Sequence, residues 1–96
     1  MVAKKVKSPR NLERYFKGVA NHRRIQILIL IARTPDITLF DIADEVNSNF
    51  KTISEHVRRL TIAGLVEKRY AGREVRHTLT PYGKVFYSFI ATFSNS

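Results

Sequence analysis

A change of hydrophobic period near residue 65 constrains this chain more than any other feature of its sequence. Upstream of it, apolar residues recur at helical spacing in a short segment, residues 39–46, and in a longer one, residues 53–64. Between them stands Asn47-Ser48-Asn49, a run of side chains that bond their own backbone in tight turns. Downstream the period becomes two. The sequence therefore predicts a short helix, a tight turn, a longer helix and then β-structure.

The β-structure is expected to be a hairpin. A period of two connects Val66, Lys68 and Tyr70 in one run and Val75, His77 and Leu79 in the other, and residues 71–74 separate the two runs. Gly72 lies in that separating segment and supplies the backbone freedom that a tight hairpin turn requires.

Three further helices are expected around this unit. Ser8-Pro9 is a helix start, because Ser caps helices and Pro suits the first helical position. Asn21 is a plausible cap for a second helix over the apolar run 25–32, whose period alone fits a buried strand equally well. The basic residues on both sides extend that run to helix length, which favours a helix. Thr38 with Asp41 approximates a capping box, and Thr80-Pro81 starts the last helix.

These elements predict a mainly α protein with a small β-hairpin (α+β), built from about five helices and two strands. The 96 residues fit one small domain. We expect residues 1–8 to form a flexible basic arm and residues 9–96 to form a single domain.

The charge pattern points to an anionic partner. The net charge is +9, with +7 in residues 1–24, −3 in residues 25–50 and +5 in residues 51–96. Two basic ends around an acidic middle can present one positive face, and nucleic acid is the leading partner for such a face. An anionic membrane fits less well, because no long helix carries a clean apolar stripe beside its basic residues. An ordinary soluble basic protein remains the plain alternative.

Several classes of protein are disfavoured. The chain has no Cys, which excludes a disulfide scaffold and a thiolate metal site, and its longest apolar run, residues 27–32, is too short to span a membrane. Because no secretory signal is visible, we expect a cytoplasmic, nucleoid-associated protein. No carboxylate pair, Gly-rich phosphate loop or nucleophile motif suggests an enzyme or a cofactor, and His22, His56 and His77 lack metal-ligand spacing.

Four stretches resemble known regulators of transcription. Residues 16–28 resemble the first helix junction of the ArsR-type winged helix-turn-helix regulators, and residues 42–46 followed by residues 52–66 resemble their recognition segment. Residues 79–83 resemble the junction between the wing and the last helix in the MarR and PadR groups. The most specific element is the spacing Ser54-x-His56-x-x-x-Leu60-x-x-x-Gly64-Leu65-Val66. The resemblance implies a homodimeric DNA-binding transcriptional regulator, with repression as the expected sign of regulation.

A winged helix-turn-helix places its second helix in the major groove of DNA and its hairpin, the wing, along the neighbouring backbone or minor groove. For the second helix we expect contacts from Asn49, Phe50, Lys51, Thr52, Ser54, Glu55 and Arg58. For the wing we expect contacts from Lys68, Arg69, Arg73 and Arg76. Glu55 repels phosphate, so it either accepts a hydrogen bond from cytosine or pairs with a neighbouring Arg. An ordinary solvated helix face is the alternative for the other residues, and His56 is expected to be partly buried.

The terminal helices are expected to form a dimer seam, because the last helix is too apolar for a single buried stripe. The expected interface residues are Leu12, Tyr15, Phe16, Val19, Tyr82, Phe86, Phe89, Ile90 and Phe93.

Sensing sites of the ArsR type are not evident. Where family metal sensors often carry paired Cys, this chain has Leu39, Phe40 and Asp41, and its last helix holds no His, Asp or Glu that could bind zinc. We therefore expect neither a metal nor a small-molecule effector. Two other functions stay open: a sequence-tolerant architectural protein on DNA or RNA, and a winged-helix module that binds other proteins.

Overall fold

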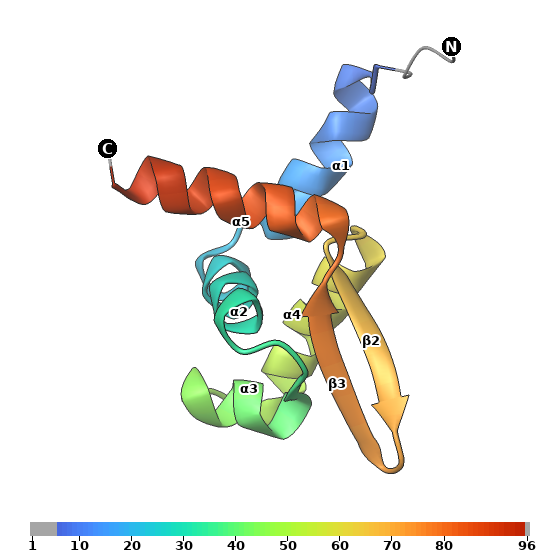
Figure 1. Ribbon diagram of the computed structural model, residues 1–96, viewed down its shortest axis with the longest axis vertical. Helices are drawn as coiled ribbons and strands as arrows, with labels where there is room; N and C mark the ends of the chain where they lie inside the picture. Colours follow the sequence, from blue (N-terminus) through green and yellow to red (C-terminus); the bar gives the residue numbers. More distant parts are fainter. Residues whose placement is uncertain (1–5, 96) are drawn as a thin grey trace.

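The computed structural model describes residues 6–95, so the first five residues of the expected arm lie outside the described part of the chain. Residues 6–95 form five helices and a small antiparallel sheet, whose β-hairpin lies along one side of the helices (Figure 1). The elements are α1 (Pro9–Val19), α2 (His22–Arg33), β1 (Ile37–Thr38), α3 (Leu39–Glu45), α4 (Phe50–Ile62), β2 (Val66–Ala71), β3 (Glu74–Leu79) and α5 (Pro81–Ser94). The predicted fold class is confirmed.

Side-chain caps fix where the helices begin. Each of the five helices is preceded by a capping residue with extended backbone: Ser8, Asn21, Thr38, Asn49 and Thr80. In each case the side-chain oxygen accepts a hydrogen bond from a backbone N–H of the first turn, which satisfies a group that the helix itself leaves unpaired. The helix starts predicted before residues 9, 22, 39 and 81 are thereby confirmed.

The apolar run after Asn21 is a helix, as its length favoured. Ile27, Leu28 and Ile31 on α2 are at most 1% exposed and form the centre of the core. Helix α2 packs against α4, α5 and β3, so apolar side chains are useful on most of its faces.

The sheet has three strands rather than the two that were predicted. The short strand β1 pairs with β3, which places Ile37 opposite His77, and β3 pairs along its whole length with β2, giving the order β1-β3-β2. Two residues are too few to show an alternating pattern, so no periodicity indicated β1. The hairpin turn itself is as predicted, with Gly72 at φ +64°.

The fold separates two ends of the molecule. In Figure 1, α1 and α5 lie at one end, whereas α3 and the turn between β2 and β3 lie at the other. Buried apolar side chains of α1 to α4 and of the strands form one core between these ends, and Phe86, Tyr87 and Ile90 of α5 pack against it. None of the helices in residues 6–95 has the length and apolar character needed to cross a membrane.

Candidate nucleic-acid interface

Helix α4 presents a polar face to solvent because its apolar face is buried in the core. Ile53, Val57 and Leu60 are at most 1% exposed, which orients the helix. On the opposite side Lys51, Thr52, Glu55 and Arg58 are exposed, while Ser54 is half-buried. The face predicted to meet DNA is therefore accessible.

The first turn of α4 is held by Asn49. Its Oδ1 accepts hydrogen bonds from the backbone N–H groups of Lys51 and Thr52, at 2.8 and 3.3 Å. This cap uses the side-chain oxygen of Asn49 internally and fixes the direction in which Lys51 leaves the helix. The Lys51 ammonium has no ion-pair partner among the described residues.

Glu55 pairs with neighbouring arginines, one of the two roles considered for it. Its Oε1 accepts hydrogen bonds from Arg58 Nη1 and from Arg59 Nε, each at 3.1 Å. All three side chains are more than half exposed, so each pair contributes less than about 1 kcal/mol to stability. The main effect of Glu55 is to hold two guanidinium groups and to offset part of their charge.

The four cations expected in the wing fall into two groups. Arg69 donates to Asp36 Oδ1 at 3.1 Å, and Arg76 donates to Glu74 Oε1 at 2.9 Å and to the Asp36 carbonyl oxygen at 3.2 Å. Both arginines therefore tie the hairpin to the loop before β1 or to itself. In the described part of the chain Lys68 and Arg73 are exposed and form no ion pair.

Asp36 is a residue whose part in the wing the sequence did not reveal. It adopts φ +67° and anchors two wing arginines from 33 and 40 residues away along the chain. In the sequence it only marked the end of a helix, since the contact partners are distant.

Two histidines have lowered pKa values for structural reasons. His77 is 1% exposed on β3, and burial lowers its pKa; its Nδ1–H donates to the Ile37 carbonyl oxygen at 3.0 Å. His56 is half-buried, as expected, and burial and then the nearby charges of Arg24 and Arg23 lower its pKa. Within residues 6–95 no three side chains of the metal-binding types gather at one place.

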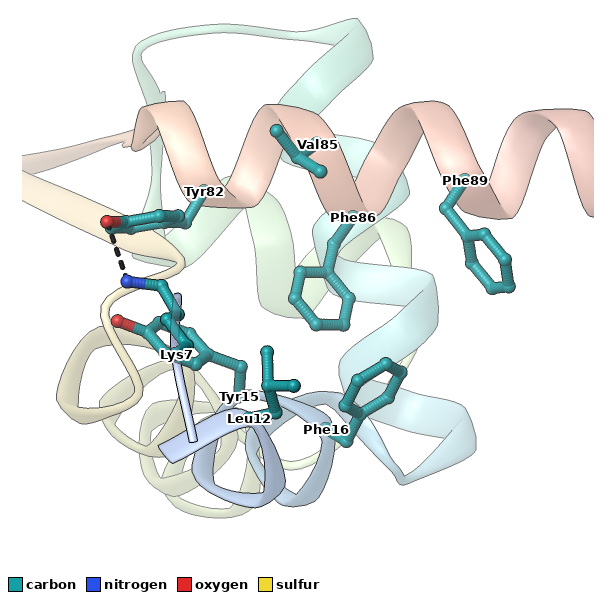
Figure 2. Close-up of a pocket in the computed structure, with 8 residues that line it drawn as sticks. All are labelled: Lys7, Leu12, Tyr15, Phe16, Tyr82, Val85, Phe86 and Phe89. Carbon is teal, nitrogen blue, oxygen red and sulfur yellow. Dashed lines mark hydrogen bonds between the residues drawn. The ribbon is translucent and has the colours of Figure 1, made fainter. Parts of the chain in front are cut away.

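A second surface lies at the opposite end, where α1 and α5 enclose an apolar groove of about 400 Å³ (Figure 2). Phe16 from α1 and Phe86 from α5 meet edge to face with ring centroids 5.2 Å apart, and Tyr15 and Tyr82 meet at the same distance. The groove is lined by Lys7, Leu12, Tyr15, Phe16, Tyr82, Val85, Phe86 and Phe89.

The residues expected at the dimer seam divide by burial. Six apolar side chains of these helices are exposed by 41–69%: Leu12, Phe16, Tyr82, Val85, Phe89 and Phe93. Tyr15, Phe86 and Ile90 are partly buried against the core of the same chain. Val19 is 7% exposed and belongs to that core, so its assignment to an intermolecular seam is wrong: the helix turns its last apolar residue inward.

Two groove residues were missing from the expected seam. Val85 stands three residues after Tyr82 and four before Phe89, so helical spacing alone could have found it. Lys7 gave no such signal. Its Nζ donates to the Tyr82 hydroxyl at 3.0 Å and lies 4.6 Å from the centre of that ring, which ties the end of the expected arm to α5.

Comparisons with known proteins agree with this geometry. A family model described as winged helix-turn-helix DNA-binding matches residues 21–67. A CadC homologue of Staphylococcus aureus, a cadmium resistance transcriptional regulatory protein, is 25% identical over 72 residues, which is 75% of this chain. The chain spans only 60% of that relative's length.

Solved structures show the same fold. The homodimeric winged helix-turn-helix domain of Mb0332 from Mycobacterium bovis, a possible ArsR-family regulator, is 25% identical, with a TM-score of 0.81 over 96% of this chain and 91% of that one. HlyU from Vibrio cholerae is 22% identical, with a TM-score of 0.84 over 96% of this chain and all of that one.

The sequence match covers α2, α3 and α4 and reaches into β2, the segment that contains the accessible polar face. The structural matches extend the likeness to α1 and α5. Residues 21–67 are therefore similar to the winged helix-turn-helix DNA-binding family, and residues 6–95 have the fold of ArsR-type regulators, as the resemblance in the sequence predicted.

Proposed function

We propose that the chain is a sequence-specific transcriptional regulator that binds duplex DNA as a homodimer, with α4 in the major groove and the wing on the adjacent backbone or minor groove. One observation carries the proposal: Lys51 on α4 and Lys68 and Arg73 on the wing are exposed cations that form no ion pair in residues 6–95. Cations that the fold does not use are available for phosphate and base contacts.

The homodimer is proposed because the groove between α1 and α5 leaves large apolar side chains in water. Phe16, Phe89 and Phe93 are 54%, 57% and 69% exposed, at a cost of about 25 cal/mol for each Å² of apolar surface. A second copy, related by a two-fold axis, would cover this surface and set two α4 helices about one DNA turn apart or a multiple of it. Mb0332, with a similar fold, is a homodimer.

Repression is the proposed mode of regulation. In this proposal the end with α4 and the wing faces DNA and the end with α1 and α5 forms the dimer, so a dimer bound to promoter DNA would act by occupying it. In a defined transcription reaction, adding the protein should lower transcript from a promoter that contains its preferred site. An increase in that transcript would contradict repression.

DNA binding is tested by its dependence on salt. For about six to ten neutralised phosphates, the logarithm of the association constant should fall linearly with the logarithm of salt concentration, with a slope on the order of −5 to −9. A slope near zero would contradict DNA binding. No measurable binding at physiological salt would favour the protein-interaction module.

Sequence specificity is tested separately, after selection of bound sites from random duplexes. At one salt concentration the preferred site should bind about 10³-fold or more tighter than random DNA. A ratio near one would favour the architectural protein.

A further inference from the structure

Two phenylalanines form an exposed pair at the DNA-facing end of the domain. Phe40 on α3 is 75% exposed and Phe50 on α4 is 43% exposed, and their ring centroids are 4.9 Å apart with an interplanar angle of 33°. Neither ring lines the groove between α1 and α5, and α3 lies at the opposite end of the molecule (Figure 1), so the dimer seam proposed above does not cover the pair.

The core does not account for this pair. On α3 the buried residues are Ile42 and Ala43, and Val46 follows as the buried C-cap. Phe40 stands two residues before Ile42, and residues two apart on a helix point in different directions. The ring of Phe40 therefore leaves the core side of α3 and rests on Phe50 at the surface, where apolar area is unfavourable unless a partner covers it.

The position of Phe50 indicates the partner. It is the first residue of α4, directly before the unpaired Lys51, and a helix-turn-helix places the N-terminal residues of its second helix against base edges. Near Phe40, by contrast, Asp41 and Asp44 are exposed acids on α3 that repel phosphate. The pair is therefore suited to the floor of the groove and not to the DNA backbone.

Only one base edge in the major groove carries an apolar group, the C5-methyl of thymine, and Phe is among the side chains that contact it. We infer that the Phe40–Phe50 pair contacts thymine methyl groups in the major groove and gives the protein a preference for T·A pairs opposite the N-terminus of α4. This inference rests on the proposed function, because it requires α4 to enter the groove.

Replacing thymine by deoxyuridine tests the inference, because it removes only the methyl group. In the preferred site, each thymine is changed in turn and the affinity of the full chain is measured. One or two positions in each half-site should bind about fourfold more weakly without the methyl, the factor expected for one buried methylene-sized group.

Variants then identify the side chains that sense the methyl. Phe50→Ala and Phe40→Ala should bind the thymine and deoxyuridine sites equally, whereas Phe50→Leu, which keeps apolar contact, should retain part of the discrimination. Ile62→Ala is the matched control, since Ile62 is an exposed apolar residue at the other end of α4. It should discriminate as the unmodified protein does. Circular dichroism of each variant verifies that it is folded. Because the Phe40 ring is the more exposed of the two, Phe40→Ala is the variant expected to affect folding least.

The outcomes separate this inference from the proposed function. If deoxyuridine at every position leaves specific binding unchanged, the thymine contact is refuted and sequence-specific binding stands. If folded Phe variants keep the full thymine preference, the pair does not read the methyl and the inference is also refuted. If no duplex is bound specifically, the proposed function fails and the inference fails with it.

Discussion

Glu55 offsets the charge of Arg58 on the exposed face of α4, where Glu55 Oε1 lies 3.1 Å from Arg58 Nη1. The same oxygen lies 3.1 Å from Arg59 Nε. One carboxylate therefore holds two guanidinium groups on the helix that is proposed to enter DNA, which lowers the positive potential of that face without removing its donors.

Glu55→Gln should raise affinity for random duplexes, because the variant has the same shape but frees both arginines for phosphate. The salt slope should steepen by about one for each arginine that gains a phosphate contact. Glu13→Gln is the matched control: Glu13 pairs with Lys17 at 3.0 Å in the same i,i+4 arrangement on α1, so the same charge is lost elsewhere. If Glu55→Gln instead weakens binding at one cytosine position only, Glu55 reads that base.

Lys51→Ala and Arg73→Ala should have different effects. Lys51 lies on α4, and its loss should change sequence preference at a cost of about 1 to 3 kcal/mol on the preferred site. Arg73 lies in the hairpin turn, and its loss should weaken all duplexes similarly and reduce the magnitude of the salt slope by about one.

Arg69→Ala is the natural comparison for Arg73→Ala, because Arg69 already pairs with Asp36. It should reduce the salt slope less than Arg73→Ala does. The affinities of Lys51→Ala, Arg73→Ala and Arg69→Ala are measured over a salt series on preferred and random duplexes. They show which side chain contributes to sequence preference and which to phosphate binding. A change of preference in Arg73→Ala alone would mean that the wing reads sequence, through the width of the minor groove, and that α4 only positions it.

The features that could be predicted from the sequence are those that depend on residues close together along the chain. Caps such as Ser8 and Thr80, and the turn at Gly72 between two short β-type runs, are local signals, so the helix starts and the hairpin could be predicted. Strand β1 is set by its pairing with β3, about 40 residues away, and has no local pattern of its own.

The candidate site, like the fold, could be predicted only in part. Helical spacing identified the exposed face of α4, but it could not tell which cations the fold already uses. Arg69 and Arg73 look equivalent in the sequence, and only the position of Asp36 separates them. Helical spacing likewise placed Val19 and Phe16 on one stripe of α1, although Val19 is buried in the core and Phe16 is exposed to solvent.

The stability of the domain should fall as the solution is acidified from pH 7.5 to pH 5. Burial lowers the pKa of His77 below its usual 6.5 in the folded state. The unfolded chain therefore takes up a proton before the folded one does, so stability is full above the unfolded pKa and is lost as pH falls through it towards the folded pKa. His56, whose pKa is also lowered, acts in the same direction.

His77→Asn isolates the contribution of His77, since Asn can still donate to the Ile37 carbonyl oxygen but does not titrate. Urea unfolding at several pH values should show a shallower dependence of the free energy of unfolding on pH for this variant. An equal dependence in both proteins would show that His77 does not titrate between the folded and unfolded states.

Gly83→Ala should destabilise the fold by about 1 to 3 kcal/mol or more, the usual cost of overpacking. Gly83 lies in the first turn of α5, where an added Cβ would collide with the backbone carbonyl oxygen of Leu65. That oxygen accepts the Thr80 N–H at 3.1 Å, so moving it also disturbs the start of the helix. Lys84→Ala, at an exposed position next to it, should change the free energy of unfolding by less than about 0.5 kcal/mol. Equal stability of the two variants by urea unfolding would contradict the close packing of α5 on Leu65.

Phe89→Glu should dissociate the proposed homodimer. Phe89 is 57% exposed, lines the groove between α1 and α5 and stacks on Phe93 at a centroid distance of 5.7 Å, so a carboxylate there would be buried without a partner at the seam. Ser88→Glu adds the same charge one residue earlier, at an exposed position that does not line the groove, and should leave the dimer intact. Sedimentation equilibrium at micromolar concentrations measures the oligomeric state of both variants.

In the dissociated Phe89→Glu variant each half-site would be bound by a separate monomer. The variant should therefore also lose high-affinity DNA binding, while circular dichroism shows that its helices remain. A monomeric unmodified protein, or a Phe89→Glu variant that stays dimeric, would refute this seam.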